Sequence, residues 1–177
     1  MKKYFFILIF FSVSFLTMNA QNGAFNSVPV VNGKVVFEQF IHTQSALSAD
    51  QKYAALSEWG KNKYTGNPNL SGLRFDDRTR TMTVSMRSDL GIQERMTMSY
   101  RFDVSVTPAG CMIVIRDISY QRPQAGSIIP VTLSAEQTIT DQAIAINDDD
   151  STLRNNTRRA TLAFFNGLFA EIERLFQ

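Results

Sequence analysis

The sequence predicts an α+β fold in which a curved antiparallel sheet is covered by a long C-terminal helix. Residues 96–106 alternate strictly between apolar and polar side chains, a pattern typical of a strand with one buried face. A turn at residues 107–110, containing Pro and Gly, joins them to the β-branched and aromatic segment 111–120, as in a hairpin. Apolar residues then recur at helical spacing between positions 153 and 176, which predicts the covering helix.

Residues 1–20 have the features of a signal peptide. Two lysines follow the first residue, apolar side chains dominate residues 4–16, and the small Ala20 precedes the expected cleavage before Gln21. The apolar run is short for a membrane span, and no second run of about 20 apolar residues occurs later. We therefore expect an exported protein, periplasmic or secreted, with no transmembrane segment after the signal peptide. An uncleaved membrane anchor is the alternative.

The single cysteine, Cys111, limits the covalent chemistry of the chain. One cysteine cannot form a disulfide within the chain, and a lipid-anchored export signal would need a cysteine at the cleavage point. Cys111 alternates with Ile113 and Ile115, which predicts a small buried side chain. A reactive thiol is the alternative.

The charge balance argues against a nucleic-acid partner. The chain has 18 basic and 16 acidic residues, and removal of the two leader lysines leaves 16 of each sign. Phosphate binding needs clustered Lys and Arg, and only one small cluster occurs, at Arg154, Arg158 and Arg159.

Residues 33–177 are expected to form a single domain, preceded by a flexible lead-in at residues 21–32. An Asn-Gly turn opens the first strand, residues 34–42. A helix follows, because Ser48 and Gln51 match a capping box and an aromatic-rich apolar stripe recurs at helical spacing behind them.

Four consecutive strands are predicted after this helix, because residues 73–75 and 81–87 precede the long hairpin with only short turns between them. Such spacing is typical of an antiparallel meander. Residues 121–150 are expected to be an irregular connection with a weak helix at 134–146. The terminal helix contains Gly167, where we expect a close contact with the sheet.

Few residues could carry catalysis. The chain has one histidine, His42, and lacks a Gly-x-Ser-x-Gly turn, a phosphate loop and a dinucleotide motif, so no cofactor is expected. One His and one Cys cannot build a common structural zinc site, and no metal site is expected. The acidic run 148–150 lacks the ligand spacing of a calcium loop and fits the start of a helix, with Asp150 reaching Arg154.

The remaining carboxylates also have structural explanations. Asp103 and Asp117 lie among Arg101 and Arg116 on neighbouring predicted strands, where cross-strand ion pairs account for them. The acidic pair at residues 76–77 has the composition of a turn. Hydrolysis by carboxylates that the sequence does not identify stays an alternative function.

Inward-facing methionines suggest a binding site. Methionine adapts its shape and is common where a surface must fit varied apolar partners. We predict an apolar ligand site between the sheet and the terminal helix, formed by Met82, Met86, Met98, Phe164 and Leu168. A dry, close-packed core is the alternative, because protein interiors have few voids.

Several segments occur together in one known family. They are residues 33–38, the helix that carries Tyr53 and Trp59, the strand meander, and an ending with Ala135, Glu136, Ile139, Thr140, Asp141, Ala143, Asn147, Leu153, Arg158, Arg159, Ala160 and Thr161. The chain resembles, over residues 30–176, an exported Bacteroidetes family of unknown function whose fold is like that of the TATA-binding protein. It departs from the family at the acidic run 148–150.

This resemblance implies a strand, a helix, four strands and a helix, and it implies no activity. Likeness to a DNA-binding protein does not carry DNA binding with it. The sequence thus predicts an exported, non-enzymatic binding or interaction module. Its expected partner is an envelope protein or an apolar small molecule, and an exported hydrolytic enzyme is the alternative.

Overall fold

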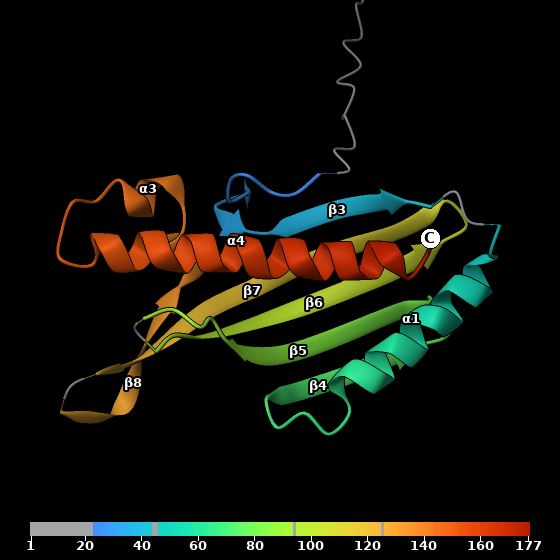
Figure 1. Cartoon of the computed structure of the whole chain (residues 1–177), viewed down its shortest axis with the longest axis horizontal. Helices are drawn as coiled ribbons and strands as arrows, with labels where there is room; N and C mark the ends of the chain where they lie inside the picture. The colour runs from blue at the N-terminus through green and yellow to red at the C-terminus, as the bar shows by residue number, and fades with distance from the viewer. Residues whose placement is uncertain (1–22, 44–45, 94, 125) are drawn as a thin grey trace, which may run out of the picture.

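A computed structural model of the chain describes residues 23–43, 46–93, 95–124 and 126–177. It shows a large antiparallel sheet with two long helices packed on one face (Figure 1), which confirms the predicted α+β fold. The predicted signal peptide at residues 1–20 and its cleavage point lie outside the described residues. Within those residues, no helix has both the length and the apolar character needed to cross a membrane.

The elements follow one another in the predicted order, with additions before the first long strand and between the long hairpin and the terminal helix. The strands are β1 (Val30–Val31), β2 (Lys34–Val35), β3 (Phe37–His42), β4 (Leu70–Asp76), β5 (Thr81–Asp89), β6 (Thr97–Thr107), β7 (Gly110–Gln124) and β8 (Ser127–Ser134). The helices are α1 (Ala49–Tyr64), α2 (Ala135–Thr138), α3 (Asp141–Ile144) and α4 (Ser151–Arg174).

The hairpin predicted from residues 96–120 is the centre of the main sheet. The strand order is β3-β7-β6-β5-β4, and all pairs are antiparallel. Every second residue of β6 is buried, as the alternating sequence predicts for a strand with one covered face.

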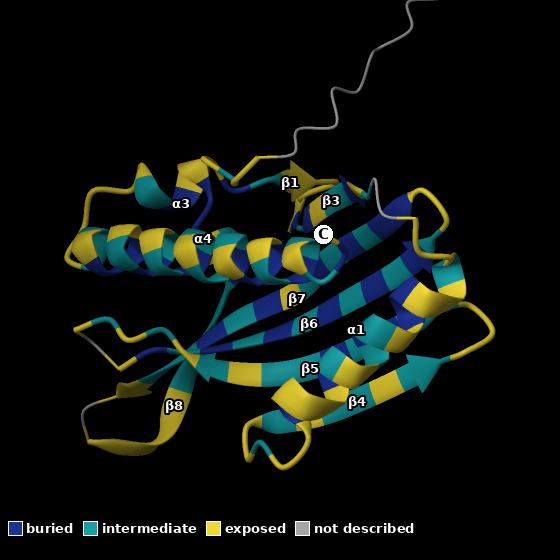
Figure 2. Cartoon of the chain, turned by 45° about the vertical axis from the view of Figure 1, so that its right-hand side comes forward, coloured by how far each residue is buried: buried dark blue, intermediate teal, exposed yellow. Residues whose placement is uncertain are grey.

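Both long helices cover the same face of this sheet (Figures 1 and 2). Helix α4 lies over β3, β7 and β6, where Phe165 packs against Phe37 and Tyr100 with ring centroids 4.9 and 5.5 Å apart. Helix α1 lies over β4 and β5. Its predicted capping box is present, with the Ser48 side chain bonded to the Gln51 backbone and the Gln51 side chain bonded back.

A β-bulge in β7 was not visible in the sequence pattern. Cys111, Ile113 and Ile115 are buried at odd positions, whereas Ile118 and Tyr120 are buried at even positions. The phase changes because the register with β6 shifts at this point and Asp117 takes a positive φ of 56°. The extra residue allows both halves of the strand to present apolar side chains to the helices.

One sequence prediction near the C-terminal half is wrong, and a second is confirmed only in part. Residues 121–134 are not irregular, since β7 continues to Gln124 and pairs with β8, so the Pro and Gly residues mark a hairpin. The expected weak helix at 134–146 is two short helices, α2 and α3. Ser134 and Thr140 cap them separately, which divides the segment.

The lead-in, expected to be flexible over residues 21–32, is packed on the core at Phe25 and Val28, while most of its other described residues are exposed. Phe25 lies against Phe37 and Phe169, with ring centroids 5.1 and 5.2 Å apart. Its backbone N–H donates to Asn166 Oδ1 over 2.7 Å, and Asn166 Nδ2 donates to its carbonyl over 3.1 Å. These contacts fix the segment on α4.

The close helix–sheet approach is at Gly60 and not at Gly167, where we expected it. A methyl group on Gly60 would lie 2.4 Å from Met82 Sδ, while one on Gly167 would meet nothing within 4 Å. The space above β5 therefore sets the identity of residue 60.

We expect Gly60→Ala to lower the free energy of unfolding by about 1 kcal/mol, because overpacking against buried Met82 outweighs the gain in helix propensity. Gly167→Ala is the matched control and should raise it by about 0.5–1 kcal/mol. Urea unfolding of both variants measures the difference. Equal stabilisation of the two would show that α1 does not pack tightly on β5.

Candidate functional site

The predicted apolar site is divided between the two helices. Met82 is fully buried beneath α1, next to Gly60, whereas Met98 is fully buried beneath α4, with its Sδ 4.0 Å from Thr161 Oγ1. Phe164 is half-buried on α4 with its ring 5.6 Å from that of Tyr100, and Leu168 is 5% exposed. Met86 is half-buried on β5. The α4 part of the set is thus separate from Met82, and its role in ligand binding stays a prediction.

Met98→Ala tests whether the α4 part of this set is a packed core or a ligand site. A packed core loses about 2–5 kcal/mol of stability on such a truncation, and the half-buried Met86→Ala should lose clearly less. If the residues bind an apolar ligand, a fatty acid should raise the melting temperature of the wild type and not that of Met98→Ala. A full core-sized loss without stabilisation by fatty acids of several chain lengths would end the apolar-site prediction.

Cys111 is fully buried, as the alternation predicts. Burial raises the pKa of its thiol to about 12, and the nearby Lys52 ammonium opposes this only in part. Such a thiol is protonated at neutral pH and is a poor nucleophile.

We therefore expect a thiol reagent to label native Cys111 slowly and the urea-unfolded chain quickly. An unfolded thiol ionises near its ordinary pKa of about 8.5, so the folded state should lose stability as the pH rises above that value. Cys111→Ala should make this alkaline loss less steep, as measured by urea unfolding between pH 7 and about 11. Rapid labelling of the native protein would contradict the buried geometry.

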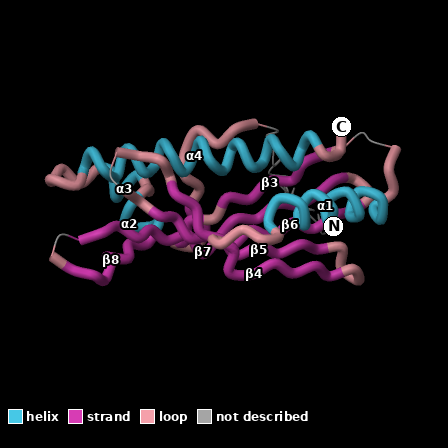
Figure 3. Tube along the Cα trace, turned by 60° about the horizontal axis from the view of Figure 1, so that its bottom comes forward, coloured by secondary structure: helices cyan, strands magenta, loops and turns pink. Residues whose placement is uncertain are grey.

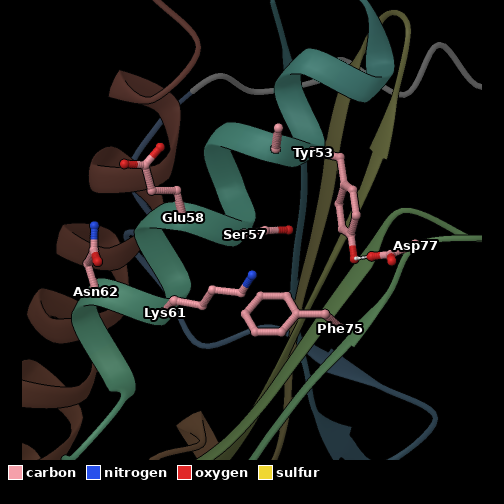
Figure 4. A pocket seen from close by; sticks show the side chains of 8 residues that line it. Tyr53, Ser57, Glu58, Lys61, Asn62, Phe75 and Asp77 are labelled. Atoms are coloured by element: carbon pink, nitrogen blue, oxygen red, sulfur yellow. Dashed lines mark hydrogen bonds between the residues drawn. The ribbon is translucent and has the colours of Figure 1, made fainter.

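A hollow lies between α1 and the end of β4, and polar side chains gather there around aromatic rings. We call it the hollow. It has a volume of about 420 Å³. Figure 4 shows its labelled residues, with the side chain of Ser57 directed from α1 towards the strands. The lining residues are Tyr53, Ala54, Ser57, Glu58, Lys61, Asn62, Phe75 and Asp77.

Helical spacing explains how α1 contributes to the hollow. Tyr53, Ser57 and Lys61 are each four residues apart and so share one face of the helix. Sequence reasoning assigned Tyr53 to the core and did not consider the polar residues beside it. The spacing of four was the available signal, but it did not show that Phe75 and Asp77 come to the same place.

Three features distinguish the hollow from ordinary surface. The Tyr53 hydroxyl donates to Asp77 Oδ1 over 2.9 Å, and burial followed by this contact raises the pKa of Tyr53 above its ordinary value. Ser57 Oγ is buried and makes no hydrogen bond of good geometry among the described residues, although its closeness to the Tyr53 hydroxyl partly offsets the raised pKa of Tyr53. Lys61 Nζ lies 5.4 Å from the centroid of the Phe75 ring, a cation–π distance.

The opposite face of the sheet carries the predicted cross-strand ion pairs. Asp103 accepts from the hydroxyl of Thr83 at 2.6 Å and from the guanidinium groups of Arg101 and Arg116 at 3.2–3.3 Å. Arg116 also contacts Asp117 at 3.1 Å. Arg101 and Arg116 are opposite each other in the register, so the carboxylate of Asp103 offsets a like-charge pair.

The acidic run before α4 pairs differently from the prediction. The Arg154 guanidinium pairs with the Asp148 carboxylate at 2.6 Å and not with that of Asp150, which instead receives two bonds from Arg122 of β7 at 2.9 and 3.2 Å. Asp150 is the N-cap residue of α4, and its side chain is taken up by Arg122 of the sheet, so the Arg154 side chain pairs with Asp148 instead. In the described ranges, no three or more His, Cys, Asp or Glu side chains are grouped as in a metal site.

Solved structures with the same architecture support a common fold. A TBP-like protein from Parabacteroides distasonis matches with a TM-score of 0.75 and 22% identity over 85% of this chain and 97% of its own. A DUF4468 family protein from Bacteroides ovatus matches with a TM-score of 0.68 and 21% identity over 86% of this chain and 92% of its own. The fold is TBP-like. No family model and no curated protein matches the sequence.

The TBP-like fold confirms the resemblance inferred from the sequence, and the two similar structures are both of Bacteroidetes proteins. At this level of identity the likeness shows the fold alone. The site must therefore be argued from the side chains of this chain.

Proposed function

We propose that this TBP-like chain is an exported, non-enzymatic binding module that takes a small polar molecule in the hollow beside α1. The observation that carries the proposal is the Ser57 hydroxyl, which is buried, lies near the Tyr53 hydroxyl, and makes no hydrogen bond of good geometry with any described residue. Buried polar atoms are normally hydrogen-bonded, and a group bound in the hollow would supply the partner that this hydroxyl lacks. Export is supported by the signal-peptide features of residues 1–20.

The hollow offers complementary polar groups for such a molecule. Glu58 and Asp77 can accept hydrogen bonds, and Lys61, Asn62 and Ser57 can donate them. Phe75 adds an apolar face. Its volume lies within the roughly 300–1,000 Å³ of small-molecule sites. A ligand with several hydroxyl or amino groups on a compact frame matches this lining.

The carboxylates give little support to the hydrolase alternative. A general acid near neutral pH needs a raised pKa. Hydrogen bonds from Thr79 and Arg154 instead hold the pKa values of Asp76 and Asp148 below the usual range. For Glu136 and Glu171, burial opposes ionisation, but hydrogen bonds outweigh it and the pKa values are lowered.

Ser57→Ala separates binding from folding. Removing a buried unpaired hydroxyl should raise the free energy of unfolding by about 1 kcal/mol in the absence of ligand. The same change should weaken binding of a small polar probe. NMR shift mapping with a neutral hexose, a dicarboxylate and an amino acid measures binding at α1 residues. Ser99→Ala, on the opposite sheet face, is the matched control.

Binding in the hollow predicts shift changes around Tyr53 and Phe75 in the wild type and in Ser99→Ala, and their loss in Ser57→Ala. Two results together would contradict the proposal. They are a loss of stability in Ser57→Ala and the absence of any shift at the hollow with all three probes.

A further inference from the structure

The end of the β7–β8 hairpin, here called the arm (described residues 123–124 and 126–133), extends beyond the rest of the sheet (Figure 1). Strand β3 pairs with β7 only as far as Ile115, and β6 pairs with it as far as Gln121. Beyond Gln121, β7 pairs with β8 alone, through Arg122 with Val131 and Gln124 with Ser127. A two-stranded ribbon of this kind has little stability of its own in water, so its extension needs an explanation.

The tip of the arm is apolar and fully exposed. Ile128 is 101% exposed and Ile129 is 72% exposed, more than any other large apolar residue in the described ranges. Pro130 is exposed beside them. Residues 123–133 contain no Asp, Glu, Lys, Arg or His. An isolated exposed isoleucine is ordinary, but two adjacent ones on a charge-free projection form an interaction surface.

The base of the arm is held firmly, which presents the tip in a fixed direction. Arg122 makes its two bonds to the Asp150 carboxylate at the start of α4. At the end of β8, Ser134 and Gln137 form a capping box that leads directly into α2. The tip thus adds no packing to the core, whereas the base of the arm is part of the main fold.

We infer that the arm is a docking element that inserts its Ile128–Ile129 tip into an uncharged apolar groove on another protein. Pro130 lies within β8 and cannot donate a backbone hydrogen bond, which disfavours strand addition along this edge. The side chains of the tip are therefore the binding groups. This inference is independent of the ligand proposed for the hollow.

The size and charge of the tip select this partner over two others. Two isoleucine side chains carry about half the apolar carbons of a myristoyl chain, which alone binds membranes only marginally. The arm also lacks the basic residues that attract anionic lipids. The hollow of a second copy is lined by the charged Glu58, Lys61 and Asp77, so it is not the uncharged groove that this tip fits. A groove on another protein can surround a small apolar anchor on several sides. The groove must be uncharged, because a charged group in it would lose its water on binding and gain no partner from the tip.

Photo-crosslinking in intact cells that export the full chain tests the inference. A benzoylphenylalanine in place of Ile128 should form a discrete crosslinked species with a mass other than twice that of the chain. The yield should fall at least about tenfold with Ile129→Asp and persist with Ile129→Val, as for an apolar anchor. In a second experiment the cells are lysed, the salt is raised to about 1 M, and the membrane fraction is then irradiated. The crosslink yield should not fall, because no charge takes part in binding.

Two control measurements separate the inference from its alternatives. The photo-crosslinker at Ile146, which is 54% exposed elsewhere, should not give the same species. Ile129→Asp should leave the melting temperature nearly unchanged, because the side chain is exposed. A crosslink to a second copy, flotation with vesicles of anionic lipid that Ile129→Asp abolishes, or no crosslink at all would each overturn the inference.

Discussion

The structure depends on two helices sharing one face of a single sheet. Helices α1 and α4 meet through Glu171, which accepts from Trp59 Nε1 at 3.0 Å and pairs with Lys63. Beneath them the alternate residues of β6, from Met98 to Val106, are buried in an unbroken row. Because this one face carries the core, the strands must alternate strictly, and the sheet must extend far enough to hold both helices.

The same constraint makes the other face polar. Threonine, serine and arginine side chains project there from β5 and β6, and Asp103 binds the two opposed arginines. In the described structure neither long helix covers this face (Figure 3). Its ion pairs are half-exposed, and such pairs contribute little to stability individually. Their shared arrangement around one carboxylate mainly prevents repulsion between neighbouring strands.

How much of the structure could be predicted from sequence depends on whether a feature is local. The β6 strand and the Ser48 cap were predicted, because alternation and capping are encoded by neighbouring residues. The β8 strand was missed, since Pro130 and the nearby Gly126 are loop signals and only pairing with β7 overrides them. The hollow was missed for a similar reason, because Ser57 and Phe75 are brought together by packing of α1 on β4. Likewise, the tight approach at Gly60 depends on Met82 of β5, and no residue spacing within α1 reveals that contact.

The bulge at Asp117 connects the core to the arm. Strand β3 pairs with β7 up to Ile115, and β8 pairs with it from Ser119, so the bulge lies where β7 exchanges one neighbour for the other. Bulges increase the local twist of a strand, and aspartate tolerates the positive φ that this one requires. Without the extra residue, Ile118 and Tyr120 would face away from α4, and Tyr120 could not reach Thr161 at 2.9 Å. One residue in an unusual conformation thus keeps the second half of β7 in the core while its partner strand changes. Beyond the core, β7 continues into the arm.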